Sequence, residues 1–237
     1  MLKLLSVAAL VFSVVSCSKV GGSDYFPLEA GMQWQYSLNY VKPDGKNNTQ
    51  LGIRTIGESA FKTEEGEVKG AVRRTSDGTD YFIQERDDGF YRVGKRVIVE
   101  TKPQADKSAR LILPKGRNLR VGYTWTLDTS PYVAHWMPPF IEANASIKPF
   151  DMVYEIASLD DTVETPAGVF QKCVRIDGMG KMVFYADASA GYQEILINHS
   201  EWYAPGVGLV KLEREEPLNT SIMKGGKVNM LLTGFIR

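Results

Sequence analysis

The chain has 237 residues, a length at which one all-β domain can bury a full core without disulfides or metals. Hydrophobic residues make up 43% of the sequence and charged residues 24%, which excludes a disordered chain and a multi-span membrane protein. Basic and acidic residues number 28 each, and this balance argues against a nucleic-acid partner, which selects a basic surface. With two histidines and two cysteines, the chain offers few metal ligands, so we expect no metal and no cofactor.

The N-terminus has the pattern of a bacterial lipoprotein signal peptide. Lys3 supplies a positive charge, and the apolar run from Leu4 to Val15, about twelve residues, is shorter than the ~20 that a spanning helix needs. The run ends at Ser16 and Cys17, as in a lipobox. This pattern predicts a signal peptide over residues 1–16, cleavage between Ser16 and Cys17, and acyl chains on Cys17. The alternative is an ordinary secretory signal in which Cys17 occurs by chance.

Lipidation would set the location of the protein. Two or more acyl chains anchor stably, so we expect a lipid-anchored protein of the bacterial cell envelope. In enterobacterial sorting an aspartate after the cysteine retains a lipoprotein at the inner membrane. Ser18 therefore favours the outer membrane, facing the periplasm, in a cell that has two membranes. Residues 17–23 form the lipidated cysteine and a short tether of at most ~20 Å, which keeps the domain close to the bilayer.

Lipidation of Cys17 would also leave Cys173 without a partner in the chain, which excludes an intramolecular disulfide. Cys173 lies in a strand-like segment, and its neighbours include no specific base that would activate a thiolate. We expect a buried, structural cysteine.

Residues 24–237 read as one domain made of strands. Apolar side chains alternate with polar ones from Gln33 to Tyr40, and the same period of two recurs at 123–127 and 228–232. Turn signals separate the strands: Pro43-Asp44-Gly45, Asp77-Gly78 and Asp87-Asp88-Gly89. No segment after the signal has the pattern of a long helix. The sequence therefore predicts an all-β, mainly antiparallel fold.

Three sequence motifs indicate a resemblance to a known group of proteins. They are Tyr25–Tyr36, Val163–Val174 and Trp202–Lys211, spread over the start, middle and end of residues 24–237. In this order, behind a lipobox, they resemble envelope lipoproteins of the TapB-like group. That resemblance implies a curved sheet or half-barrel similar in architecture to the lipoprotein carriers LolA and LolB, and it implies no ligand. Pro166-Ala167-Gly168 and Pro205-Gly206 also have a structural explanation as turns.

Searches for catalytic motifs find none. The sequence has no Gly-x-Ser-x-Gly elbow and no phosphate-binding glycine loop, and Gly178-Met179-Gly180 lacks the rest of a dinucleotide fingerprint. His199-Ser200-Glu201 could hold an acid–base pair, but we discount it because adjacent strand residues point to opposite faces. The acidic pairs Asp160-Asp161 and Glu215-Glu216 are interpreted as solvated turn or edge charges. We therefore expect no enzyme and no catalytic residue.

Two classes of function remain. The favoured one is a membrane-anchored, non-catalytic binding or assembly module for an envelope protein or a hydrophobic ligand. The alternative is a periplasmic hydrolase with an unrecognised carboxylate site. An open apolar trough inside the sheet would favour the module, whereas converging carboxylates around His199 would favour the hydrolase.

The segment Pro131–Ile141 is the candidate interaction surface. It is rich in aromatic and apolar residues, and Pro138-Pro139 bars it from a central strand. We expect it to cover the mouth of the sheet or to expose an apolar patch, with Trp136 and Phe140 as the contact residues. The alternative is a loop that packs on the core for stability alone.

Overall fold

The computed structural model describes residues 25–142, 147–187 and 191–237, and this part of the chain is built mainly from strands. In chain order the strands are β1 (Gln33–Lys42), β2 (Gly45–Thr63), β3 (Gly66–Thr75), β4 (Asp80–Arg86), β5 (Gly89–Arg96), β6 (Gln104–Pro114), β7 (Thr124–Thr129), β8 (His135–Trp136), β9 (Phe150–Thr165), β10 (Gly168–Asp187), β11 (Gly191–Ala204), β12 (Gly208–Asn219) and β13 (Met223–Ile236). A short 3₁₀ turn, η2 (Gly116–Asn118), lies between β6 and β7. The described residues contain no α-helix, and hence no helix that could cross a membrane.

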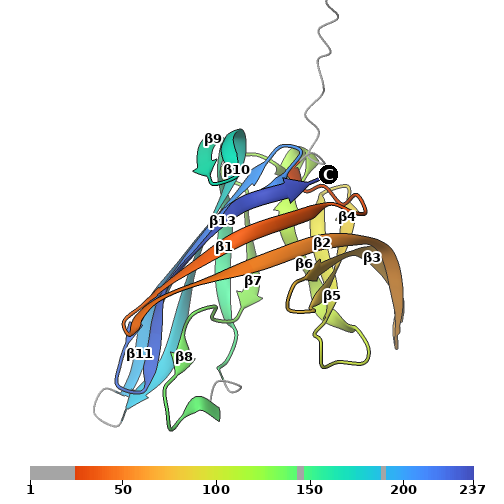
Figure 1. Ribbon diagram of the computed structural model, residues 1–237. Helices are drawn as coiled ribbons and strands as arrows, with labels where there is room; N and C mark the ends of the chain where they lie inside the picture. The colour runs from red at the N-terminus through yellow and green to blue at the C-terminus, as the bar shows by residue number, and fades with distance from the viewer. Residues whose placement is uncertain (1–24, 143–146, 188–190) are drawn as a thin grey trace, which may run out of the picture.

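All thirteen strands belong to one sheet, in the order β6-β5-β4-β3-β2-β1-β13-β12-β11-β10-β9-β7, with β8 paired to β13 off this path. The chain runs through successive hairpins from β1 to the edge strand β6, crosses to the other edge strand β7, and returns until β13 pairs with β1 (Figure 1). All the strand pairings are antiparallel. This confirms the all-β prediction.

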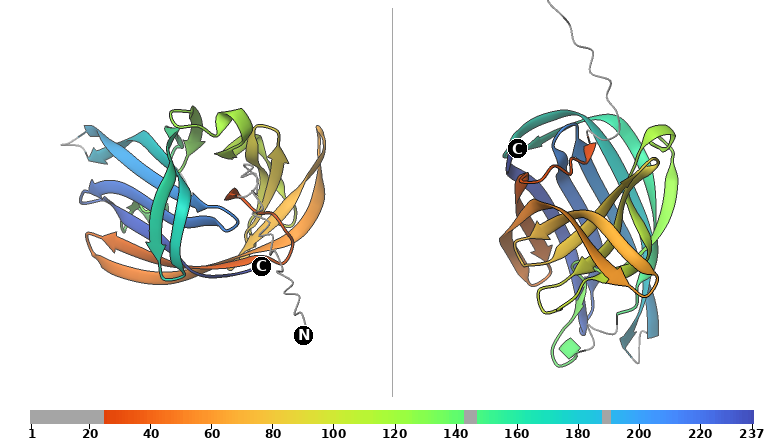
Figure 2. Two further views of the ribbon diagram at one scale, coloured as in Figure 1. Left: turned by 90° about the horizontal axis from the view of Figure 1, so that it is seen from above. Right: turned by 90° about the vertical axis from the view of Figure 1, so that its right-hand side faces the viewer.

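The sheet curves into a nearly closed barrel, and the strands form a ring when seen from above (Figure 2). Its two edge strands meet through side chains. Arg110 on β6 forms an ion pair of 2.6 Å with the Asp128 carboxylate on β7, and it also donates to the Asp128 main-chain carbonyl. The half-barrel architecture is therefore confirmed, with a seam between β6 and β7.

The turns lie where the sequence places them. Pro43-Asp44 joins β1 to β2, Asp77-Gly78 lies between β3 and β4, and Asp87-Asp88 joins β4 to β5. Gly78 has φ +85° and Gly206, between β11 and β12, has φ +69°. Side chains with a Cβ rarely adopt this left-handed region, which is why glycine occupies both turns.

The predicted period of two on β1 is confirmed. Trp34 and Tyr36 are 1% and 2% exposed, and they bury their rings against the turn between β11 and β12. Trp34 Nε1 donates to the Val207 carbonyl at 2.7 Å, and the Tyr36 hydroxyl donates to the Leu209 carbonyl at 2.9 Å. Both rings are thus buried without leaving a polar atom unpaired.

Cys173 is buried on β10, as predicted. Its side chain is in the core with 0% of its surface exposed, and its thiol lies 3.5 Å from the Phe170 carbonyl. Burial, with the nearby charge of Asp161, raises the pKa of the Cys173 thiol to about 11. At neutral pH the thiol is therefore protonated, which suits a packing role.

Candidate functional site

The interior of the barrel contains a cavity of about 270 Å³, which we call the lumen. Strands from both arms of the sheet line it, together with residues of the two end segments. Its aliphatic and aromatic members are Phe26, Tyr36, Ile53, Tyr81, Ile83, Leu111, Ile112, Trp125, Leu127, Tyr132, Tyr154, Ile176, Tyr203 and Leu209. A concave, mainly apolar cavity with a few polar groups is typical of a small-ligand site.

The N-terminal segment lies at one end of the lumen. The Phe26 ring packs against the rings of Phe90 and Tyr203, with centroid distances of 5.1 and 6.1 Å. The Tyr25 hydroxyl donates to the Lys172 carbonyl on β10. These contacts fix residues 25 and 26 of the first sequence motif inside the barrel.

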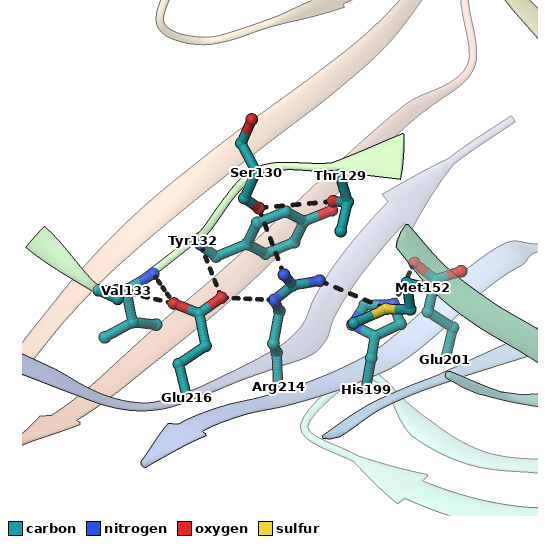
Figure 3. Close-up of polar contacts among 10 residues, drawn as sticks. Thr129, Ser130, Tyr132, Val133, Met152, His199, Glu201, Arg214 and Glu216 are labelled. Carbon is teal, nitrogen blue, oxygen red and sulfur yellow. Dashed lines mark hydrogen bonds and ion pairs between the residues drawn. The ribbon is translucent and has the colours of Figure 1, made fainter. Parts of the chain in front are cut away.

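The segment that precedes β8 lies at the opposite end, where Glu216 on β12 holds it. The Glu216 carboxylate accepts hydrogen bonds from the backbone N–H groups of Tyr132, Val133 and Ala134, at 2.7 to 2.8 Å (Figure 3). Three backbone donors on one carboxylate fix the path of the segment across the interior.

Glu216 also forms a buried ion pair with Arg214. Both side chains have 0% exposure, and Arg214 Nε lies 2.7 Å from Glu216 Oε1. The Arg214 guanidinium lies 4.0 Å from the centroid of the Tyr132 ring and donates to the Ser130 carbonyl (Figure 3). The interpretation of Glu215-Glu216 as solvated charges is therefore wrong for Glu216. The period of two directs Glu216 inward and leaves Glu215 exposed.

His199, Glu201 and Tyr203 project from β11 to the same inner face, which corrects the discounted acid–base pair. These residues are two apart, so the alternation of a strand brings them together. His199 Nε2 lies 3.0 Å from Glu201 Oε1, and the Tyr203 hydroxyl donates to Glu201 Oε2 at 2.6 Å. Burial alone would raise the pKa of Glu201, but the hydrogen bonds from His199 and Tyr203 and the charges of His199 and Arg214 hold it below its ordinary value.

In the trio of His199, Glu201 and Tyr203, the charge on Glu201 decides which groups donate hydrogen bonds and which accept them. An ionised carboxylate only accepts hydrogen bonds, so His199 Nε2 is the donor to Glu201. Glu201 lines the lumen, whereas the His199 side chain is 1% exposed and lies among the rings of Tyr132 and Tyr154. Glu201 is thus the group of the trio that combines a negative charge with access to the lumen.

Three arginines line the lumen, and they differ in their partners. Arg92 binds both carboxylate oxygens of Asp106, at 2.7 and 2.8 Å, and Arg110 is paired with Asp128 across the seam. Arg73 has no carboxylate within ion-pair distance in the part of the chain that the structure describes.

The Arg73 guanidinium is held by aromatic rings and one carbonyl. It lies 3.9 Å from the Phe26 ring centroid and 4.7 Å from that of Trp34, and its Nη2 donates to the Pro27 carbonyl at 2.6 Å. Its Nε is buried without a hydrogen-bond partner. Burial lowers the pKa of Arg73 to about 10, so the group is still charged at neutral pH.

A wider pocket of about 800 Å³ adjoins the lumen at the seam. Four residues line both: Arg92, Arg110, Thr129 and Tyr132. Lys95 and Lys107 contribute further to the outer pocket. The two cavities therefore share part of their walls at the seam.

Of the site residues that the sequence predicts, Trp136 and Phe140 do not line the lumen. Ser16 and Cys17 fall outside the described residues. Trp136 is half-buried in β8, which pairs with Met223 and Lys224 of β13, and Phe140 is 47% exposed. No group of three or more potential metal ligands occurs among the residues that the structure describes.

The inward-facing charged residues were missed, although a signal for two of them exists. Arg73 is followed by Arg74, and Glu216 follows Glu215, each within a strand that has one buried face. Because consecutive strand residues point to opposite faces, one member of each pair has to point inward. Two adjacent like charges in such a strand therefore mark a buried charge.

Comparison with known proteins gives two similar solved structures. One is a provisionally named lipoprotein of Parabacteroides distasonis, 14% identical, covering 90% of this chain and 98% of its own, with a TM-score of 0.40. The other is a provisionally named exported protein with a YmcC-like fold from Bacteroides fragilis, with the same identity and coverage and a TM-score of 0.38. No family model and no curated protein matches the chain. The function proposed below depends on the residues of this chain.

Proposed function

We propose that the chain is a membrane-anchored bacterial envelope lipoprotein, akin to the TapB-like group, that binds a hydrophobic ligand in its lumen without catalysis. The observation that carries this proposal is the lumen itself, which aromatic and aliphatic side chains line and an outer pocket adjoins. Burial of apolar ligand surface against such walls provides the binding free energy. The polar groups set the orientation of the ligand.

The proposed anchor fits this arrangement. Seven residues lie between Cys17 and Tyr25, and the eight residue steps from one to the other give a reach of at most ~28 Å. The barrel end that contains Tyr25 would therefore face the bilayer, which in our proposal is the outer membrane seen from the periplasm.

A hydrolase is the second candidate, because His199 and Glu201 form a hydrogen-bonded pair at the lumen wall. Two features favour the non-catalytic role. His199 is buried behind Glu201, and both oxygens of Glu201 already accept hydrogen bonds. This trio supports the wall of the lumen and orients the Glu201 charge.

The test is a titration of residues 18–237, which include the whole described barrel, with the neutral dye N-phenylnaphthylamine. Leu127 on β7 lines the lumen, whereas its neighbour Thr126 is exposed on the outer face. We expect saturable binding that Leu127→Trp weakens at least about tenfold by filling the lumen, while Thr126→Trp binds like the wild type. Absent binding, or equal binding by all three proteins, would contradict the proposal.

A further inference from the structure

The lumen wall contains one half-buried arginine, Arg73, that forms no ion pair among the described residues. Arg92 and Arg110 each have a carboxylate partner, and the Glu201 carboxylate has two donors. Arg73 has aromatic rings, one carbonyl and an unpartnered Nε. A buried guanidinium N–H without an acceptor is costly, so the retention of Arg73 at a cavity wall calls for an explanation.

We propose that Arg73 binds an anionic head group, and that the ligand of the lumen is an amphiphile with a carboxylate or phosphate at one end. This inference rests on the proposed function, because it assigns the polar end of the same ligand.

The geometry of Arg73 suits this role. The rings of Phe26 and Trp34 lie close to the guanidinium and hold it in place. A guanidinium carries five N–H donors in its plane, and only the bond to the Pro27 carbonyl uses one of them among the described residues. In-plane donors match the two oxygens of a carboxylate or phosphate.

The surroundings of Arg73 complete the fit for an amphiphile. Ile53, Ile83 and Leu209 lie among the aliphatic residues that line the same cavity. An acyl or alkyl chain would contact these side chains while its charged end meets Arg73. A cationic head group at this position would instead face the positive charge of Arg73.

The experiment compares three ligands of equal chain length: decanoate, decyl phosphate and the neutral 1-decanol. Each is titrated by calorimetry, below its micellar concentration, into residues 18–237. The variant is Arg73→Met. The matched control is Arg74→Met, since Arg74 lies on the outer face and pairs with Asp80 at 2.6 Å.

We expect the wild type and Arg74→Met to bind at least one of the two anions about tenfold or more tightly than 1-decanol. Arg73→Met should lose this preference and still bind 1-decanol with wild-type affinity. The ratio of the affinities for decyl phosphate and decanoate distinguishes a preference for a phosphate head group from a preference for a carboxylate. Arg73→Lys should retain part of the preference, because it keeps the charge and loses the planar donors.

Two results would overturn the inference. If wild-type protein binds 1-decanol as tightly as both anions, Arg73 is no anion site while the hydrophobic lumen stands. If it binds none of the three ligands, the proposed function fails as well. The wild-type comparison needs no variant, so it can overturn the inference even if Arg73→Met does not fold.

Discussion

The two ends of the barrel each contain an inward-facing arginine, buried Arg214 and half-buried Arg73, but the two arginines are satisfied in different ways. Arg214 is paired with Glu216 and also bonds the Ser130 carbonyl, so its charge is neutralised within the protein. Arg73 is surrounded by the rings of Phe26 and Trp34 and has no carboxylate partner among the described residues. The first arrangement fastens a segment of the chain. The second leaves a charge available to a ligand.

This difference separates stability from binding. Removing one member of a buried ion pair leaves the other charge uncompensated, which is strongly destabilising. Removing a half-buried charge that has no ion-pair partner relieves part of a desolvation cost instead. A substitution in the Arg214–Glu216 pair should therefore lower the stability of the fold. A substitution of Arg73 should change ligand selection with little effect on stability.

The largest expected effect is that of Glu216→Ala. This substitution leaves Arg214 and three backbone N–H groups without their acceptor, and we expect a loss of about 3–5 kcal/mol in the free energy of unfolding. Glu215→Ala, on the exposed face of the same strand, should change it by less than about 0.5 kcal/mol. Urea unfolding monitored by circular dichroism measures both. Equal, small effects would show that the pair does not fasten the segment.

Arg73→Met sharpens the comparison at the other end. Methionine retains much of the apolar contact with the two rings and removes the unpaired charge, so we expect a change in stability of less than about 1 kcal/mol. Arg214→Met should cost about 3 kcal/mol or more, because Glu216 is left buried and charged. The same unfolding assay compares the two variants. A loss at Arg73 as large as that at Arg214 would contradict the distinction.

Strand β8 and the segment that follows it provide a third test. Trp136 is half-buried and Phe140 is exposed, so the Trp136→Ala, Phe140→Ala double variant should fold nearly normally. If this surface contacts a partner, the acylated variant should lose a protein that the wild type captures from native membranes. Tyr132→Ala serves as a contrast, since it faces the lumen and contacts Arg214. Unfolding of the double variant, or unchanged capture, would exclude an interaction surface here.

Cys173 belongs neither to the surroundings of Arg73 nor to those of the Arg214–Glu216 pair. The reactivity of its thiol therefore tests the packing of the core. Its burial and raised pKa predict that a thiol reagent at pH 8 labels the native protein at least about 100-fold more slowly than the unfolded chain. The sign of the pH dependence follows. The folded state holds the proton up to about pH 11 and the unfolded thiol up to about 9, so the contribution of Cys173 to stability falls as pH rises through this window. Rapid native labelling would contradict the burial.

Much of the fold follows from local sequence signals. The turns and the alternation on β1 depend on residues close in the chain, so the sequence alone predicts them. The seam between β6 and β7 does not, because it depends on the accumulated curvature of the whole sheet. Gly178 illustrates the limit. A Cβ there would meet the Tyr154 ring at 2.9 Å, so a glycine that suggested a nucleotide motif makes room for an aromatic ring.

The candidate site was harder to predict than the fold. Asp160-Asp161 behaves like the other like-charged pairs, because Asp160 is exposed while Asp161 accepts hydrogen bonds from Arg175 and Trp202. The period of two indicates that one charge of each pair turns inward. Which inward charge finds a partner depends on distant strands, and no local pattern contains that information.

The most direct test of the central claim is a crystal structure of residues 18–237 grown with 10-bromodecanoate, whose bromine is located by anomalous scattering. We expect the bromine inside the lumen, near Leu209 or Ile53, and the carboxylate within about 3 Å of the Arg73 guanidinium. A well-ordered crystal with an empty lumen, or with bromine only on the outer surface, would contradict the account.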